Sequence, residues 1–125
     1  MSILQGQCLK SVKLLDPVSA AATVNATSGW VDVREAEGDI VFINQVGART
    51  GTIIWTIEHA SDGAGTGAAA ITPNEGAYTT SGANEIQSRS VNGSAVAGWV
   101  RCVGTIGTGP ALVAVSLKYH PKYTT

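Results

Sequence analysis

Three observations predict an all-β protein folded as an antiparallel β-sandwich. Short apolar segments recur at intervals of about 8–12 residues, with Gly, Asn, Asp and Pro between them. No window combines the apolar spacing of an amphipathic helix with an absence of Gly, Ser and Thr. Strands do not alternate with helical segments, which argues against a parallel sheet. With 125 residues, the chain is expected to form one domain over residues 1–125.

The first two expected strands are short. Cys8–Leu15 is expected to be the first strand and to end at Asp16-Pro17, because Asp and Pro favour turns. Residues 1–7 before it are expected to form an N-terminal arm. Trp30–Arg34 places Val31 and Val33 on one face, as the period of two in a strand requires.

The next two expected strands carry the clearest patterns. Asp39–Gln45 contains Ile40–Ile43, which is apolar on both faces and is typical of a strand covered on both sides. In Thr52–His59 two isoleucines and Trp55 point one way, and polar residues mostly point the other. We therefore expect Trp55 in the core. We expect His59 to be a hydrogen-bonded residue at the end of its strand.

Weaker signals occupy the middle of the chain. Ala60–Gly67 is rich in Gly and is expected to be a loop. Ala68–Ile71 forms either a short edge strand or one helical turn before Pro73. Glu85–Val91 is expected to be a further strand.

The last two expected strands are long. Val96–Ile106 and Ala111–Tyr119 flank Gly107–Pro110, which suits a hairpin turn because Gly adopts positive φ and Pro is tolerated at a strand start. A tail over residues 119–125 follows. Seven or eight strands indicate an antiparallel sandwich, and a count of eight favours a jelly-roll arrangement. An immunoglobulin-like sandwich remains the alternative, although the spacing of Trp55 between Cys8 and Cys102 does not match that family.

Composition excludes several classes of partner. Charged residues make up 14% of the chain, against about 25% in average proteins. The net charge is −1 and the basic residues are scattered, so we expect no nucleic-acid partner. Neither a signal peptide nor a run of about 20 apolar residues is present, so we expect no membrane partner and synthesis in a cytoplasm. Cys8 and Cys102 are then expected to be reduced core thiols, and a disulfide between them stays open.

The sequence contains no pattern typical of an enzyme or a cofactor site. No C-x-x-C or H-x-x-x-H spacing is present for a metal, and no G-x-S-x-G turn for a nucleophile. The glycine-rich stretches lack the helix and the lysine of a phosphate loop. The run Arg34–Asp39 is expected to be a solvated charged turn, which could also meet a basic patch or bind a cation. We expect no enzyme, no cofactor and no metal.

Three stretches carry a family resemblance. VDVREAEGDIVFINQVGARTGT (Val31–Thr52), TIEHASDGAG (Thr56–Gly65) and GWVRCVGTIGTGPALVAVSL (Gly98–Leu117) resemble small virion proteins of tailed bacteriophages. The resemblance implies a β-sandwich that decorates or cements an icosahedral head, often as a homotrimer. It implies the major capsid protein and further copies of the chain as partners. It implies the capsid surface of a virion made in a host cytoplasm as the location.

Under this interpretation the working residues lie in the arm, two loops and the tail. The expected capsid or subunit contacts are Ser2, Ile3, Leu4, Trp30, Glu35, Glu37, Asp39, Asp62, Tyr119 and Tyr123. Exposed aromatic residues among them would serve as anchors, because they bury a large area at a small entropy cost. The alternative is a carbohydrate- or receptor-binding module of a phage head fibre or tail. In that case Trp30, Trp55 and Trp99 would form a stacking platform.

Overall fold

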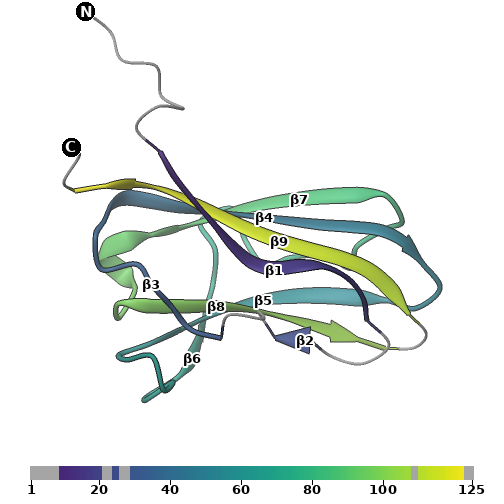
Figure 1. The fold of residues 1–125 in the computed structure, drawn as a ribbon, viewed down its shortest axis with the longest axis horizontal. Coiled ribbons are helices and arrows are strands. Elements are labelled where there is room, and N and C mark those ends of the chain that lie inside the picture. The colour runs from purple at the N-terminus through teal and green to yellow at the C-terminus, as the bar shows by residue number, and fades with distance from the viewer. Residues whose placement is uncertain (1–8, 21–23, 26–28, 108–109, 123–125) are drawn as a thin grey trace, which may run out of the picture.

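The computed structural model describes residues 9–20, 24–25, 29–107 and 110–122. In them the chain forms two antiparallel sheets packed face to face (Figure 1). The elements are β1 (Lys10–Ala20), β2 (Val24–Asn25), β3 (Val31–Asp32), β4 (Ala36–Arg49), β5 (Ile53–Ala60), β6 (Ala69–Ile71), β7 (Glu85–Asn92), a 3₁₀ turn η1 (Gly93–Ala95), β8 (Trp99–Ile106) and β9 (Ala111–Pro121).

The strand order identifies a jelly roll. The first sheet has the order β1-β9-β4-β7 and the second sheet the order β2-β8-β5-β6, with β3 also paired to β8. β2 and β3 pair with successive stretches of β8 and act as one interrupted strand. The antiparallel pairs are then first with last, second with second-last, and so on inward to β5 with β6. An immunoglobulin-like sandwich would pair its first strand with its second, so that alternative is wrong.

The core lies between the sheets, where alternate side chains of the long strands meet. In β5 the inward residues are Ile53, Trp55 and Ile57, which confirms the prediction for Trp55. Gly104 of β8 pairs directly with Trp55, and a β-carbon at Gly104 would lie 2.7 Å from Trp55 Cζ3. The other large side chains of the core are Leu14, Ile40, Phe42, Val91, Val100, Leu117 and Tyr119.

The first strand is longer than its sequence predicts. β1 continues through Asp16 and Pro17 to Ala20, so the prediction that these residues end the strand is wrong. The register against β9 shifts twice, between Lys13 and Leu15 and again before Val18. β1 is the edge strand of the first sheet, and an edge strand tolerates a proline because one row of its backbone groups pairs with no strand.

The connection between β8 and β9 does not form the expected hairpin. β8 belongs to the second sheet and β9 to the first, so the chain passes from one sheet to the other between Gly107 and Pro110. These two residues lie beside the β4–β5 connection, which makes the same crossing. Gly107 N donates to Thr52 O at 2.9 Å, and Thr50 N donates to Pro110 O at 3.0 Å. Two hydrogen bonds thus join the two connections at one end of the sandwich.

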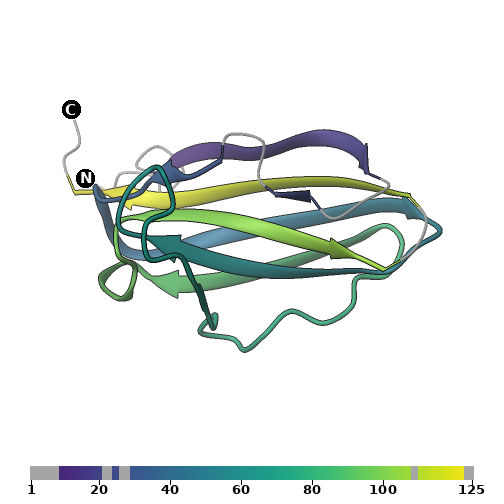
Figure 2. The ribbon, with the colours of Figure 1, turned by 90° about the horizontal axis from the view of Figure 1, so that it is seen from below.

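The segment between β6 and β7 runs along one open side of the sandwich (Figure 2). Its backbone bonds to both sheets: Asn74 N to Ser90 O at 2.8 Å and Ser81 N to Ile53 O at 2.9 Å. Tyr78 from this segment is buried, and its hydroxyl donates to Asn44 Oδ1 at 2.6 Å. β6 pairs with β5, which confirms an edge strand in place of a helical turn.

Candidate functional site

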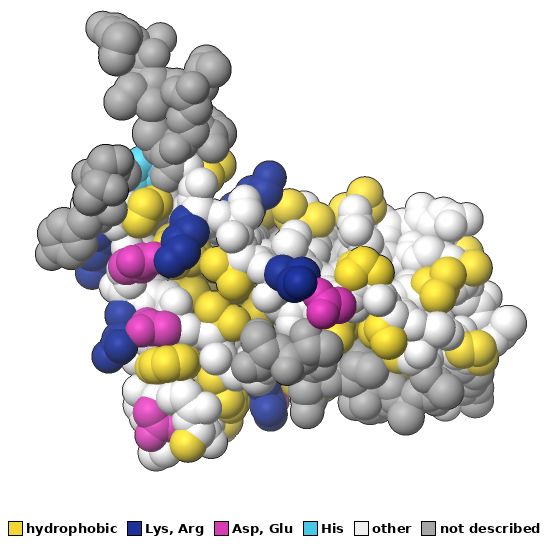
Figure 3. Space-filling model, viewed as in Figure 1, with side chains coloured by type: hydrophobic (Ala, Val, Ile, Leu, Met, Phe, Trp, Pro, Cys, Tyr) yellow, Lys and Arg dark blue, Asp and Glu magenta, His cyan; other side chains and the backbone are white. Residues whose placement is uncertain are grey.

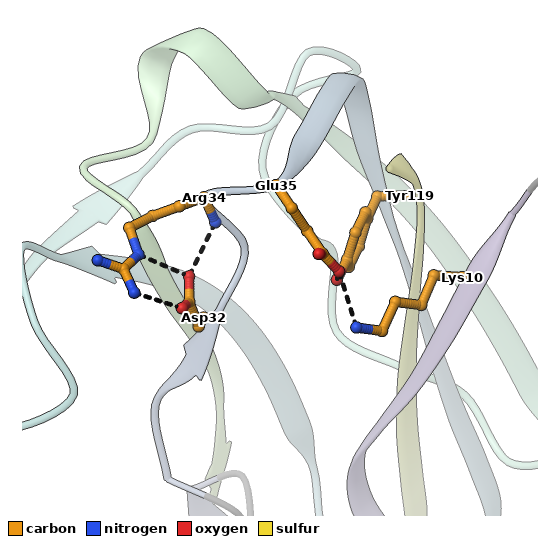
Figure 4. Close-up of polar contacts among 5 residues, drawn as sticks. All are labelled: Lys10, Asp32, Arg34, Glu35 and Tyr119. Atoms are coloured by element: carbon orange, nitrogen blue, oxygen red, sulfur yellow. Dashed lines mark hydrogen bonds and ion pairs between the residues drawn. The ribbon is translucent and has the colours of Figure 1, made fainter. Parts of the chain in front are cut away.

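Charged residues of three segments meet at the end of the sandwich where β1 begins and β9 ends (Figure 4). We call Lys10, Asp32, Arg34, Glu35 and Tyr119 the charged corner. Glu35 Oε1 lies 2.7 Å from Lys10 Nζ and accepts a 2.6 Å hydrogen bond from the Tyr119 hydroxyl. The Arg34 guanidinium holds both carboxylate oxygens of Asp32, at 2.9 and 2.7 Å. The turn between β3 and β4 is thereby tied to the edge strand β1 and to its neighbour β9 in the first sheet.

The charges of the corner balance each other. The hydrogen bond from Lys10 and then that from Tyr119 hold the pKa of Glu35 below its usual value. The hydrogen bond from Arg34 lowers the pKa of Asp32 in the same way. Burial of the Tyr119 ring, and then its bond to Glu35, raise the pKa of that hydroxyl. At neutral pH the corner therefore holds two cations and two anions, which stabilise the turn and leave little net charge.

The corner predicts a pH dependence for the stability of the fold. The pKa of Glu35 in the folded chain lies below the ordinary value of 4.5. Glu35 therefore contributes fully to the stability of the fold above pH 4.5, and this contribution is lost as the pH falls through the folded pKa. A Glu35→Gln variant cannot ionise, so we expect its melting temperature to fall less than that of the wild type between neutral and acid pH. Thermal melts across that range test this, and parallel curves would contradict it.

Three of the predicted contact residues, Glu37, Asp39 and Asp62, are exposed, as a contact with another protein requires. That they make such a contact stays a prediction. Glu37 and Asp39 are exposed at the start of β4. Asp62 is exposed in its loop, where Oδ1 accepts from Ala64 N at 2.9 Å and Thr66 N at 3.0 Å. These bonds, with that from Thr66 foremost, lower the pKa of Asp62. This carboxylate orders its own loop. The remaining predicted contacts, Ser2, Ile3, Leu4 and Tyr123, lie outside the described residues.

The prediction that Tyr119 is an exposed anchor is wrong. Its side chain is 2% exposed, because it shares the inward face of β9 with Val113, Val115 and Leu117. The tail is also shorter than expected, since β9 continues to Pro121 and Lys122 N donates to Glu35 O at 2.7 Å.

The three tryptophans do not form one platform. Trp55 faces the core, whereas Trp30 and Trp99 are half-buried near the outer face of the second sheet. The Arg101 guanidinium lies 4.6 Å from the centre of the Trp30 ring, and that of Arg34 lies 5.6 Å from the centre of the Trp99 ring. Cations thus cover these rings already, and the proposed stacking platform is wrong.

A groove with apolar walls crosses the outer face of the first sheet, at the end away from the charged corner. We call it the apolar groove; its volume is about 520 Å³, and it is lined by Pro17, Val18, Ser19, Gln45, Val46, Gly47, Asn84, Glu85, Ile86, Leu112, Val113 and Ala114. Charged side chains gather over the half of the molecule nearer the termini, while the far end of this view carries only hydrophobic and uncharged ones (Figure 3). Sequence reasoning missed this groove, although the outward position of Leu112 in its strand was a signal.

No catalytic arrangement is present among the described residues. No three His, Cys, Asp or Glu side chains of that part of the chain gather as a metal ion would need. Burial raises the pKa of the Cys102 thiol to about 12, so it stays protonated. His59 Nδ1 accepts from Ala97 N at 3.0 Å, which confirms a hydrogen-bonded residue near the strand end. Within the described ranges, no helix has the length and apolar character to cross a membrane.

The chain is a jelly-roll β-sandwich, and its described residues contain no cluster of three His, Cys, Asp or Glu side chains that could hold a metal ion. No protein-family model and no curated protein matches it. It is similar to a chain of the T13 particle of infectious bursal disease virus, with 11% identity and a TM-score of 0.46, over 90% of this chain and 31% of the viral one. It is also similar to a chain of the Gx strain of that virus, with 14% identity and a TM-score of 0.44, over 90% of this chain and 32% of the viral one. The chain spans about a third of the length of both.

Proposed function

We propose that this chain is a structural protein of a bacteriophage virion that binds the outer surface of the capsid and cements or decorates the head. One observation carries the proposal. The start of β4, with the exposed Glu37 and Asp39, and the loop with Asp62 lie at the same end of the sandwich as the two ends of the described chain. Such an end, presented by a rigid sandwich, suits contact with a large surface.

The composition supports the same role. A chain with 14% charged residues covers its surface with small polar and apolar side chains, which bind other proteins at a low desolvation cost. The major capsid protein is the proposed partner, and a basic patch on it would complement the exposed carboxylates of Glu37 and Asp39. The bacteriophage resemblance of Val31–Thr52 and Gly98–Leu117 favours a head surface as the location, reached after synthesis in the host cytoplasm.

Homotrimerisation is part of the proposal. Three linked copies would each contact a shell subunit, and the linked contacts would convert modest interfaces into high avidity. A trimer would have a mass three times 12.8 kDa, about 38 kDa. Bound to shells, three standard interfaces would each bury roughly 1,600 Å².

Binding to purified phage heads that lack the chain tests the proposed function. We expect the protein to sediment with the heads, and a Glu37→Gln/Asp39→Asn variant to bind several-fold more weakly, because its carboxylates no longer pair with the shell. Asp16→Asn is the control, since Asp16 is exposed on β1 away from this end. Absence of binding to heads, or equal weakening by the control, would contradict the proposal.

A further inference from the structure

We propose that the apolar groove is the surface by which this chain binds a second copy of itself. Four large hydrophobic side chains are exposed among the described residues, and three of them line this groove. They are Val18, Leu112 and Ile86, which are 40%, 48% and 61% exposed. A gathered apolar surface of this kind on a small domain marks a contact with another protein. This inference rests on the self-association in the proposed function and deepens it, because it names the surface through which the copies bind each other.

The groove combines a recess with a projecting side chain, Ile86, on the same face of the sheet. Gln45 of β4 pairs with Ile86 of β7 on one side and with Ala114 of β9 on the other, so these residues form one row across the sheet. At Gly47, two residues along, a β-carbon would lie 3.3 Å from Leu112 Cβ, so glycine keeps the floor low. The hollow over this floor lies beside the projecting Ile86. The same face thus offers both a projecting side chain and a recess.

A knob and a recess on one face favour a second copy as the occupant. In a two-fold pair, Ile86 of each copy enters the groove of the other. In a three-fold ring, each copy gives its Ile86 to the next copy and receives one from the previous copy. Both arrangements bury the same residues, so the groove provides a contact surface for the proposed homotrimer as well as for a pair.

The charge distribution also favours a copy of the chain. Glu85 is the sole charged residue lining the groove, and its oxygens accept from Gly82 N at 3.2 Å and Gln87 Nε2 at 2.9 Å. A charged partner surface would therefore lose its hydration here without gaining a partner. The groove of a second copy carries the same single carboxylate, already hydrogen-bonded within its own chain, and a net charge of −1 opposes association only weakly.

The size of the face sets the strength of the contact. The groove is lined by three residues from each of four segments. A contact that extends over about six residues of each strand, with strands about 4.8 Å apart and about 3.3 Å per residue, covers roughly 400 Å² per copy. The pair would bury roughly 800 Å² in total, below the ~1,200 Å² at which stable interfaces begin. We therefore expect association of the free chain in the micromolar range, with rapid exchange. Attachment of several copies to one shell would strengthen it.

Analytical ultracentrifugation of the full chain from roughly 5 to 200 µM tests the inference. We expect the wild type to shift with concentration from 12.8 kDa toward a mass two or three times larger. Leu112→Lys and Ile86→Lys should each raise the dissociation constant at least about tenfold, because a buried lysine finds no partner in the groove. Ile54→Lys is the matched control, since Ile54 is 44% exposed on the outer face of the second sheet.

The outcomes separate the inference from the proposed function. A wild type that stays at 12.8 kDa over the whole range would overturn the inference, and so would an Ile54→Lys variant that dissociates as much as Leu112→Lys. Thermal melts of all four proteins should agree within a few degrees, because the three substituted side chains are exposed. Self-association without binding to heads would contradict the proposed function alone. Binding to heads by a monomeric chain would contradict the inference and the proposed homotrimer, and would leave the proposed binding to the head standing.

Discussion

Replacing Asn44 with alanine should lower the free energy of unfolding by about 3 kcal/mol. Asn44 is 1% exposed and lies on β4, in the first sheet. Its Nδ2 donates to Cys102 Sγ of the second sheet at 3.2 Å, and its Oδ1 accepts from the Tyr78 hydroxyl at 2.6 Å. One amide thus joins both sheets to the segment between β6 and β7. Alanine would leave a cavity and a buried hydroxyl without its acceptor.

Chemical denaturation with tryptophan fluorescence measures this loss, and Gln45→Ala is the control. Gln45 is the next residue of the same strand but is exposed, so its replacement should change stability by less than about 0.5 kcal/mol. The double variant Asn44→Leu/Tyr78→Phe should recover most of the loss, since removing both polar partners leaves neither unsatisfied. A double variant as unstable as Asn44→Ala would show that packing, and not the hydrogen bond, carries the effect.

The sequence predicts the strands well because period-two alternation is a local property. Ile53, Trp55 and Ile57 occupy the core face that their spacing indicates. Alternation puts Tyr119 on the same face of its strand as Val113, and the structure shows that this face is the inner one, whereas the functional interpretation treats Tyr119 as a surface anchor. The error lay in assuming that an aromatic residue near the end of the chain is exposed, although the strand in fact continues past it.

Which strands pair with each other is not a local property of the sequence, and the predictions that depend on strand pairing fail. Gly107–Pro110 has the composition of a hairpin turn, yet β8 and β9 pair with strands far away in the sequence. A glycine-rich turn permits a hairpin and a crossing between sheets equally. The apolar groove escaped prediction for the same reason. Its walls come from four strands, and only the register of Gln45 with both Ile86 and Ala114 brings them together.

Replacing Gly65 with alanine should lower the free energy of unfolding by about 3 kcal/mol, by two separate effects. Gly65 has a φ of +84°, where an L-residue with a β-carbon is strained by about 1–2 kcal/mol. A β-carbon there would also lie 2.6 Å from Trp30 Nε1, inside van der Waals contact. The indole would have to leave its place under Arg101, whose guanidinium lies 4.6 Å from the Trp30 ring centre.

Gly67→Ala separates the two effects, because Gly67 has a similar φ of +68° but open space where a β-carbon would stand. We expect this control to lose only about 1 kcal/mol, the strain alone. The difference between the two variants in the free energy of unfolding, measured by chemical denaturation, then gives the cost of displacing the Trp30 indole. Equal losses would mean that the indole moves freely, and the stacking of Arg101 on Trp30 would then contribute little to the stability of the loop. A larger loss at Gly65 would show that packing of the Trp30 indole against Gly65 stabilises the loop with Asp62, which is the loop that the proposed function places against a shell.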